Sequence, residues 1–337
     1  MTVSAILNRR YTPRRKDAVQ RAKRIRRIAR ELGYRPNAAA RTMASGRFGA
    51  VALLMSADVS GRSSLPGGLL RGLTSALDAR GMYLAIADLP DERLTDERFV
   101  PKILREWMSD GLLINYNWQI PARMIEIIED YKLPSVWLNC KREHDCVYPD
   151  DFDAARRLTS LLISRGHRRI AYADFHHGFG SEPDEHYSKA DRWSGYWAAM
   201  AEAGLTPMRI DTGDSPHRNR STYEFWAAPA ATCLSAQDRP TAVIGYSHDD
   251  LGAFALAARG LGLRVPDGLA LATFGEGERV FIHGLQVPAA QLPEERVGRT
   301  AVERVLEKIE SPLRTLVPVS VPFDLNERGL VGPRSPE

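Results

Sequence analysis

Two kinds of apolar segment alternate along the chain from residue 49 onward. Short apolar runs such as 51–55 and 111–115 predict buried strands, and longer stretches with apolar positions at helical spacing lie between them. Glycine marks the end of some of these stretches, as Gly81 does. This order predicts an α/β fold in which a parallel sheet carries helices on both faces.

The chain of 337 residues is long enough for two or three domains, and the alternation is sufficient for two lobes. The expected strands are 51–55, 83–87, 111–115, 135–138, a strand that follows the turn beginning at Gly166 and includes Tyr172, 241–246, 269–274 and 315–321. The expected helices are 69–80, 99–108, 122–131, one that opens at 149–155 and runs to 164, 192–203, 251–260 and 297–309.

A separate amphipathic helix is expected before this body. Its apolar positions recur at helical spacing at Ala18, Ala22, Ile25, Ala29 and Leu32. Asp17, with Gln20 three residues later, matches a capping box, and Thr12 before Pro13 is an alternative start. Gly33 can take the left-handed conformation that ends a helix.

The segment after Gly33 predicts a stop and a second, short helix. Pro36 prevents the first helix from continuing, and Asn37 can cap the second one. Residues 38–44 favour a helix but are too few to hold one alone in water. This helix should therefore form only when something packs against it, although an ordinary alanine-rich linker is an alternative interpretation.

Charge divides the chain at the same place. Residues 1–47 contain 14 Lys or Arg and only two acids, Asp17 and Glu31, whereas the remainder carries 32 basic and 40 acidic residues. A basic head on an acidic body is typical of proteins that bind nucleic acid, since neutralised phosphates provide much of the affinity. A solvated helix face is the alternative, but few acids are present to pair with these cations.

Composition, with 44% hydrophobic and 26% charged residues, is that of an ordinary globular protein. No apolar run approaches the length that spans a bilayer, and the N-terminus has no signal-peptide core, so no membrane association is expected. The three cysteines, Cys140, Cys146 and Cys233, lack metal spacing and suit a reducing cytoplasm. A redox pair formed by Cys140 and Cys146 is the less favoured interpretation.

Metal binding and catalysis have little support. His176, His177 and His186 lie in a segment rich in Gly, Ser, Glu and Asp, which favours an exposed loop over a metal site. No phosphate loop, nucleophile elbow or paired-carboxylate motif stands out. We therefore expect no enzyme activity, no metal and no cofactor.

Several segments together resemble the LacI/GalR family of transcriptional regulators. The hinge-like segment 31–47 (ELGYRPNAAARTMASGR) is the most specific of them. The others follow in the family's order: 164–170 (SRGHRRI), 191–196 (DRWSGY), 239–243 (RPTAV) before His248 and Asp249, and 263–267 (LRVPD). The resemblance covers nearly the whole chain and implies a two-lobed, type I periplasmic-binding-protein-like sensor with a small all-α DNA-binding segment.

The resemblance divides the chain into 1–35 (a partial helix-turn-helix segment), 36–47 (a hinge helix) and 48–337 (the effector-binding and dimerisation domain). Residues 2–8 (TVSAILN) resemble the family's recognition helix, and Met43 stands where the family has an apolar wedge that enters the minor groove. Alanine at position 5 offers only a methyl contact to a base. The implied DNA-binding residues are Thr2, Ser4, Ala5, Asn8, Arg9, Tyr34, Asn37, Ala40, Arg41 and Met43.

A helix-turn-helix needs a first helix to brace the recognition helix, and only Met1 precedes residue 2. Two explanations are open. The start codon is set too far downstream, which we favour because the remaining residues fit the motif, or the gene encodes a truncated regulator.

Ligands of parallel sheets bind beyond the carboxyl ends of the strands. The resemblance implies that the effector-binding residues are Ser63, Ser64, Asp150, Arg192, Asp249 and Glu276. For Asp150, Arg192 and Asp249, a helix cap or an interlobe ion pair is the alternative role. Ser63 and Ser64 stand where the family has aromatic residues, and Gly275 stands where it often has Asp, so these positions depart from the pattern.

The expected protein is a cytoplasmic, ligand-responsive repressor that binds a pseudo-palindromic double-stranded operator as a homodimer. The expected effector is a small molecule of the carbohydrate class. The alternative is a truncated regulator or a solute-binding protein that senses a small molecule without specific DNA binding. A solute receptor would carry an export signal or a neutral head, and neither is present.

Overall fold

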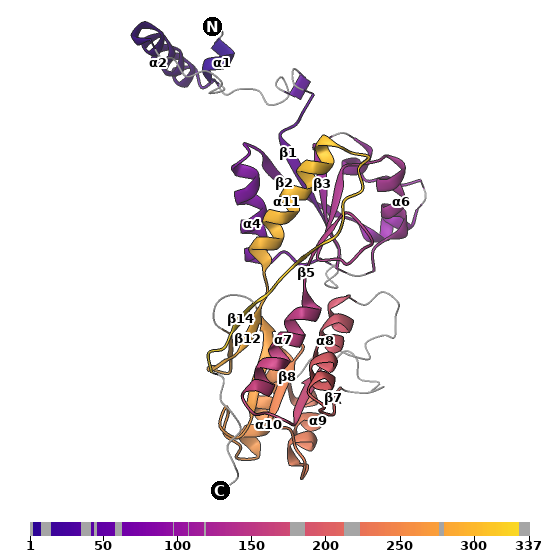
Figure 1. Cartoon of the computed structure of the whole chain (residues 1–337). Coiled ribbons are helices and arrows are strands. Elements are labelled where there is room, and N and C mark those ends of the chain that lie inside the picture. The colour runs from indigo at the N-terminus through magenta and orange to yellow at the C-terminus, as the bar shows by residue number, and fades with distance from the viewer. Residues whose placement is uncertain are drawn as a thin grey trace.

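The computed structural model describes residues 3–7, 15–34, 42–43, 46–57, 63–96, 98–106, 108–117, 119–175, 186–211, 223–275 and 280–329. Two α/β lobes lie one above the other, and two helices stand apart above the upper lobe (Figure 1). We call the upper lobe lobe 1; it comprises residues 50–149 and 294–321. The lower lobe, lobe 2, comprises residues 151–291 and 324–326.

The head contains α1 (Val3–Leu7) and α2 (Lys16–Glu31), which pack together so that Ile6 and Ala22 are buried. Gly33 has a φ of 61°, and Tyr34 N–H donates to the Ala29 carbonyl while Gly33 N–H donates to that of Arg30. These bonds form a Schellman motif, so the prediction of a left-handed helix end at Gly33 is confirmed.

The predicted cap at Asp17 is wrong. Helix α2 begins at Lys16 after Arg15, whose backbone is extended and whose side chain makes no cap hydrogen bond. Asp17 instead lies within the first turn, where a carboxylate favourably meets the helix dipole. The alternative start at Thr12 and Pro13 lies outside the described residues.

Lobe 1 is built on a parallel sheet with the strand order β13-β5-β4-β3-β1-β2. The strands are β1 (Ala50–Ser56), β2 (Tyr83–Leu89), β3 (Gly111–Asn115), β4 (Ser135–Leu138), β5 (Cys146–Pro149) and β13 (Val319–Val321). Alternate residues of β1 point to opposite faces: Val51 and Leu53 join one apolar core, and Ala52 and Leu54 join the other.

Helices cover both faces of this sheet. The helical elements are α4 (Gly67–Asp78), the 3₁₀ helix η1 (Asp91–Thr95), α5 (Lys102–Arg105), α6 (Ala122–Asp130) and α11 (Glu294–Glu310). The core with Val51 contains residues of α4 and α11, and the core with Ala52 contains residues of η1, α5 and α6. Figure 1 shows α4 and α11 together on one face of lobe 1.

Lobe 2 repeats the plan with the strand order β14-β12-β9-β8-β6-β7, parallel except where β12 meets β14. The strands are β6 (Ile170–Ala173), β7 (Met208–Ile210), β8 (Ala242–Gly245), β9 (Ala270–Gly275), β12 (Ala289–Gln291) and β14 (Asp324–Asn326). The helices are α7 (Asp151–Ser164), α8 (Ser188–Glu202), α9 (Tyr223–Ser235) and α10 (His248–Gly260). One core contains α7 and α8, and the other contains α9 and α10.

A small antiparallel hairpin, β10 (Val280–Ile282) and β11 (Leu285–Val287), completes lobe 2. The chain passes between the lobes three times, after β5, after β12 and after β13. Each lobe is therefore assembled from segments that lie far apart in the sequence.

The predicted α/β architecture is confirmed, with one clear error among the helices. The helix predicted over 99–108 is limited to residues 102–105. Pro101 precedes that turn and disfavours helical backbone at Val100, so the helix begins only at Lys102. The pattern also missed α9 and several strands of three or four residues, namely β5, β7, β10, β11, β12 and β14.

Candidate functional site

A buried arginine of lobe 2, Arg192, lies on the same helix as residues that contact lobe 1. Arg192 on α8 donates from Nε to Asp151 Oδ1 at 2.6 Å and from Nη1 to the Tyr246 carbonyl at 2.9 Å. Its guanidinium carbon lies 4.2 Å from the Phe274 ring centroid and 4.8 Å from that of Tyr246. Arg192 is thus held on two sides by hydrogen bonds and on its flat faces by aromatic rings.

The carboxylate partner of Arg192 is Asp151, the first residue of α7, which is 1% exposed. Burial by itself lowers the pKa of the Arg192 guanidinium. The attraction and hydrogen bond of Asp151, together with the nearby Tyr246 and Tyr172, outweigh burial and leave that pKa raised. Arg192 therefore stays positively charged.

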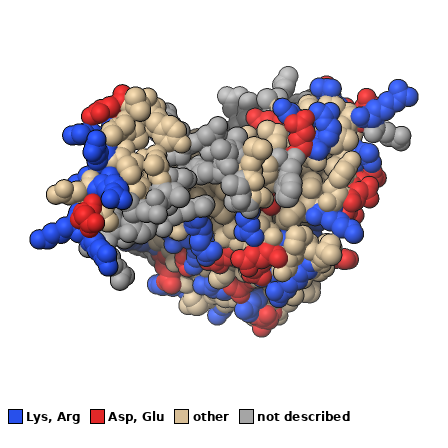
Figure 2. Space-filling view, turned by 90° about the horizontal axis from the view of Figure 1, so that it is seen from above, with Lys and Arg blue, Asp and Glu red and all other residues tan. Residues whose placement is uncertain are grey.

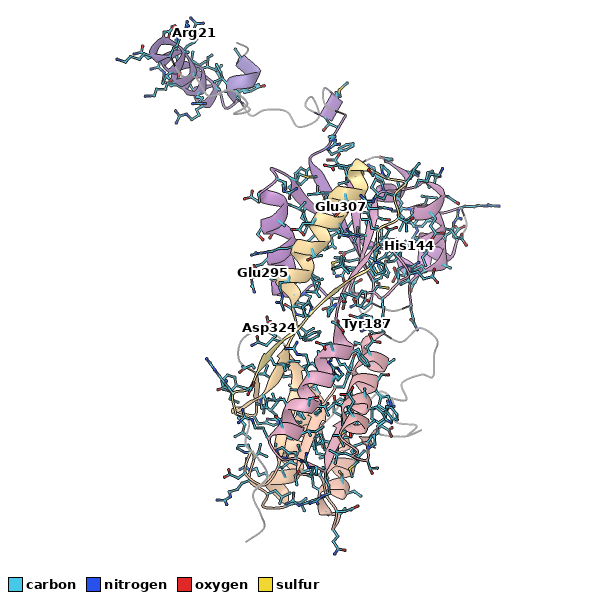
Figure 3. The ribbon with its side chains drawn as sticks, viewed as in Figure 1. Arg21, His144, Tyr187, Glu295, Glu307 and Asp324 are labelled. Atoms are coloured by element: carbon cyan, nitrogen blue, oxygen red, sulfur yellow. The ribbon has the colours of Figure 1, made fainter. Side chains whose placement is uncertain are left out.

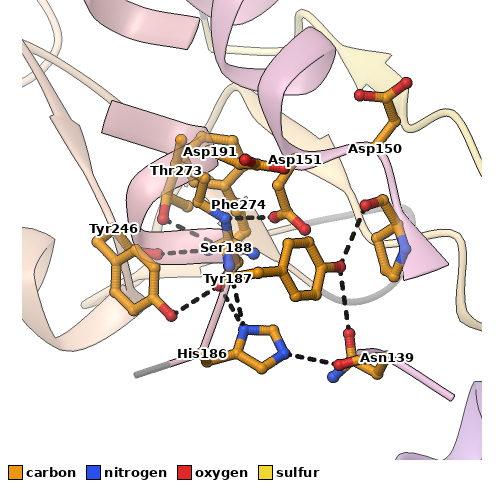
Figure 4. A network of polar contacts seen from close by, with 12 residues as sticks. Asn139, Asp150, Asp151, His186, Tyr187, Ser188, Asp191, Tyr246, Thr273 and Phe274 are labelled. Atoms are coloured by element: carbon orange, nitrogen blue, oxygen red, sulfur yellow. Dashed lines mark hydrogen bonds and ion pairs between the residues drawn. The ribbon is translucent and has the colours of Figure 1, made fainter. Parts of the chain in front are cut away.

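The N-terminus of α8 connects lobe 2 to lobe 1. His186 Nε2 lies 2.9 Å from the Asn139 carbonyl, and the Tyr187 hydroxyl donates to the Pro149 carbonyl at 3.1 Å. The Tyr187 ring meets Tyr148 edge to face at 5.4 Å between centroids. Figure 3 shows Tyr187 between the two lobes, and Figure 4 shows the contacts around it.

The protonation state of His186 follows from its neighbours. The carbonyl of Asn139 accepts a hydrogen bond from Nε2–H, and Ser188 N–H approaches Nδ1 at 3.4 Å. Ser188 Oγ lies 2.7 Å from Nδ1 and 3.0 Å from the Tyr246 hydroxyl. Burial lowers the pKa of His186, so the neutral ring with its proton on Nε2 fits this site.

An ion pair at the edge of the same contact also joins the lobes. Lys141, which follows β4, donates to Asp191 on α8 at 2.8 Å. The Lys141 side chain is 45% exposed and the Asp191 side chain 19% exposed, so solvent screens this pair. It favours one relative placement of the lobes more than it stabilises the fold.

The predicted effector residues do not form a single group. Asp150 caps α7 by accepting from Asp153 N–H at 3.1 Å, and it lies apart from the dashed contacts in Figure 4. Asp249 is exposed in the first turn of α10, whereas the neighbouring Asp250 is fully buried and accepts from Phe175 N–H. Glu276 lies outside the described residues.

Ser63 and Ser64 belong to a separate cluster at the end of β3. Ser63 Oγ accepts from Ser56 N–H at 2.8 Å and donates to the Asn115 carbonyl at 2.6 Å. Asn115 is fully buried, and its Nδ2 donates to the Ser64 carbonyl at 2.6 Å while its Oδ1 has no hydrogen-bond partner among the described residues. Sequence reasoning missed Asn115, although its place at the end of a buried strand was a usable signal.

Most of the predicted DNA-binding residues, namely Thr2, Asn8, Arg9, Asn37, Ala40 and Arg41, lie outside the described residues. Ser4 and Ala5 lie in α1. Tyr34 is 56% exposed and Met43 is 90% exposed. Arg21 on α2 points away from the lobes in Figure 3, and Lys and Arg atoms surround the head at the left of Figure 2.

The sequence predicts that the segment with His176, His177 and His186 is an exposed loop and not a metal site. His176 and His177 lie outside the described residues, and His186 contacts Asn139 of lobe 1 instead. Within the described ranges, no three His, Cys, Asp or Glu side chains gather as a metal site. No helix in that same part of the chain is long and apolar enough to cross a bilayer.

Comparison with known proteins agrees with this architecture. Residues 159–329 match the family model of the periplasmic binding protein-like domain. The HTH-type transcriptional regulator GntR of Escherichia coli (strain K12) is 28% identical over 304 residues, covering 89% of this chain and 86% of GntR.

Two solved structures share the fold. The lac repressor dimer bound to operator and the anti-inducer ONPF has a TM-score of 0.71 at 17% identity, covering 97% of this chain and 93% of the repressor chain. The complex of the transcriptional regulator CelR with cellobiose has a TM-score of 0.62 at 22% identity, covering 96% and 94%.

The fold, the interlobe site and the family model together define a periplasmic-binding-protein-like sensor. With the head attached and regulators among its relatives, the chain belongs to the LacI/GalR family of ligand-responsive transcriptional regulators.

Proposed function

We propose that this protein is a repressor that binds a pseudo-palindromic operator as a homodimer and that a small sugar, held between its lobes, changes that binding. The observation that carries the proposal is the connection of a strongly basic helical head to a two-lobed sensor through the linker at 35–49. The head would supply phosphate contacts, and the lobes would supply the ligand-dependent movement. The regulators among the relatives support this role rather than an enzymatic one.

The sugar assignment rests on the chemistry around Arg192. Aromatic rings of Phe274 and Tyr246 adjoin a guanidinium. The Asp150 carboxylate follows β5 of lobe 1, and the Asn115 carboxamide ends β3, with β4 between the two strands. Aromatic faces suit the C–H face of a sugar ring, and carboxylate and amide groups suit its hydroxyls. The cellobiose complex of CelR, a protein of the same fold, agrees with this class of ligand. Ser63, Ser64, Asp249 and Glu276 remain proposed members of the site.

The domain boundaries are part of the same proposal. Residues 1–35 would contact the major groove, 36–47 would form the hinge helix on the operator, and 48–337 would bind effector and dimerise. A DNA partner requires a cytoplasmic location. Met43 would insert between base pairs, since its apolar side chain is 90% exposed to water.

The test begins with selection of a duplex from a random library by the full-length protein. Met43→Gly should weaken binding of that duplex by at least about tenfold, roughly 1.4 kcal/mol, because the wedge is lost and the hinge helix is harder to form. Met43→Ala removes the wedge with little loss of helix propensity, and Met43→Leu should restore binding. Electrophoretic mobility shifts provide the measurement.

Two outcomes would contradict these assignments. Equal affinity of the wild type, Met43→Gly and Met43→Leu proteins would remove Met43 from the operator interface. Failure of the wild-type protein to enrich any duplex would favour a sensor without specific DNA binding. For the effector, calorimetry against neutral mono- and disaccharides, cellobiose included, should find at least one ligand whose addition changes duplex affinity.

A further inference from the structure

One carboxylate holds the linker to lobe 1. Asp110, the residue before β3, accepts from Phe48 N–H through Oδ1 and from Gly49 N–H through Oδ2, both at 2.8 Å. Its own N–H donates to the Ala50 carbonyl at 2.8 Å. Two linker residues and the first residue of β1 are therefore bound to Asp110, which is 8% exposed.

The chemistry of this contact suits a carboxylate. The adjacent backbone N–H groups of Phe48 and Gly49 both reach the Asp110 carboxylate. Gly49 has a φ of 70°, a conformation that glycine adopts without strain, and it turns the chain from these N–H groups into β1. The carboxylate offers a separate oxygen to each donor, and its negative charge strengthens each bond. Beyond the clamp, the Gly49 carbonyl accepts from Tyr83 N–H at 3.1 Å, so the chain enters the sheet in a fixed direction.

Packing contributes less than hydrogen bonding at this point. A cavity of about 430 Å³ adjoins the clamp and is lined by Gly46, Arg47 and Asp110 on the linker side and by Leu104, Tyr131 and Pro134 across it. A linker that borders open space on one side is positioned mainly by its hydrogen bonds. Loss of the Asp110 carboxylate should therefore leave the direction of the linker unfixed without disturbing the core of lobe 1.

The Asp110 clamp and the cluster of Ser63, Ser64 and Asn115 lie at opposite ends of the same strand. Asp110 immediately precedes β3, and Asn115, with its buried carboxamide, ends it. Strand β3 pairs with β1 and β4 at the centre of the sheet, so it moves with lobe 1 as a rigid element. When lobe 1 rotates, the linker residues bound to Asp110 move with it.

We propose that Asp110 is the positioning residue that makes the direction of the linker, and hence the placement of the DNA-binding head, follow the orientation of lobe 1. The inference rests on the proposed function, because it concerns how the sensor controls the head. In a dimer, two such clamps would set the distance between the two hinge segments. Affinity for a two-half-site operator depends on that distance, whereas affinity for unspecific DNA depends mainly on charge.

The test compares Asp110→Asn with Asp130→Asn in the full-length protein. Asparagine keeps the size of the side chain but presents an NH₂ group to one of the two linker N–H groups. Asp130, exposed at the end of α6, has the same charge and does not line the cavity beside the linker. The probes are the duplex enriched by the wild-type protein and an unselected duplex of the same length.

Asp110→Asn should bind the enriched duplex at least tenfold more weakly, bind the unselected duplex within twofold of wild type, and show faster hydrogen exchange at the Phe48 and Gly49 amides. Asp130→Asn should match wild type in all three measurements. Equal losses on both duplexes with a lowered thermal midpoint would show a merely structural role and overturn the inference. Wild-type affinity for the enriched duplex would overturn it as well.

Failure of the proposed function has a different signature. If the wild-type protein enriches no duplex, specific DNA binding itself is refuted. The role of Asp110 in positioning the head is then refuted too, even if Asp110→Asn speeds hydrogen exchange at the Phe48 and Gly49 amides. If the wild-type protein enriches a duplex and Asp110→Asn binds it normally, only the inference about Asp110 fails.

Discussion

At the scale of single residues, the ion pair of Arg192 and Asp151 has the largest energetic consequence. Asp151 is 1% exposed and Arg192 is 8% exposed, so removing one partner leaves the other charge buried. Breaking a buried pair in this way is strongly destabilising, whereas replacing both partners with apolar residues of similar volume is often nearly neutral.

Arg192→Met should therefore lower the free energy of unfolding by about 3–5 kcal/mol. Adding Asp151→Leu in the same chain should recover much of that loss, because no buried carboxylate then remains. Urea denaturation of Arg192→Met, Asp151→Leu and the double variant gives a double-mutant cycle that measures the interaction between the two side chains. Additive losses would mean that the two side chains do not act on each other.

The sequence placed Arg192 and Asp150 at the ligand-facing edge but did not distinguish Asp150 from Asp151. Both carboxylates stand at the start of a predicted helix, and either one suits a cap or a ligand contact. Only the packing of α7 against α8 decides that Asp151 turns inward to Arg192 while Asp150 accepts from the backbone. Asp249 and Asp250 differ for a similar reason, since Asp250 is buried and accepts from Phe175 N–H whereas Asp249 is exposed.

At the scale of elements, close packing of α7 against α8 explains a glycine that the sequence presents only as part of a motif. A Cβ on Gly195 would lie 2.2 Å from the Phe152 carbonyl oxygen and 3.0 Å from Ala155 Cβ. No side-chain rotation relieves a contact with backbone. The two helices approach this closely only because position 195 has no side chain.

Gly195→Ala should consequently destabilise the protein by about 1–3 kcal/mol, as overpacking does. Gly260→Ala is the matched control, since a Cβ there meets nothing within 4 Å at the end of α10. The control should be neutral or slightly stabilising because alanine favours helix. Midpoints of chemical denaturation report both changes, and equal effects of the two substitutions would refute the packing argument.

Long elements with a clear period were predictable, and short ones were not. Helices such as α4 and α11 each present an apolar stripe, and β1 and β3 are unbroken apolar runs. Strands β5, β12 and β14 have only three or four residues. They exist because distant strands offer them an edge, and such pairing leaves little trace in the local sequence.

At the scale of the whole molecule, the two lobes are joined by contacts that depend on pH. His186 bonds to Asn139 as a neutral ring, and burial lowers its pKa below the ordinary value. A group whose pKa is lowered on folding binds protons more readily when unfolded. Its contribution to stability is complete above a pH of about 6.5 and is lost as the pH falls below that value.

The free energy of unfolding should thus decrease between pH 7 and pH 5.5 more steeply in the wild-type protein than in His186→Gln. Glutamine has an N–H that can donate to the Asn139 carbonyl but has no titrating group. Thermal unfolding of both proteins across this range measures the difference. Parallel curves would show that His186 is not responsible for any acid sensitivity.

The order in which the segments of lobe 1 occur along the chain has a consequence for the protein as it leaves the ribosome. Lobe 1 starts with β1 but needs α11 and β13, whose residues 294–321 are translated after nearly all of lobe 2. Until then, the apolar face that Val297, Ala301, Val302 and Val305 will cover stays exposed, and β5 lacks its neighbour β13. A nascent chain halted near residue 290 therefore presents a bare apolar surface and an open strand edge, which is where chaperones bind and where aggregation of incomplete chains begins.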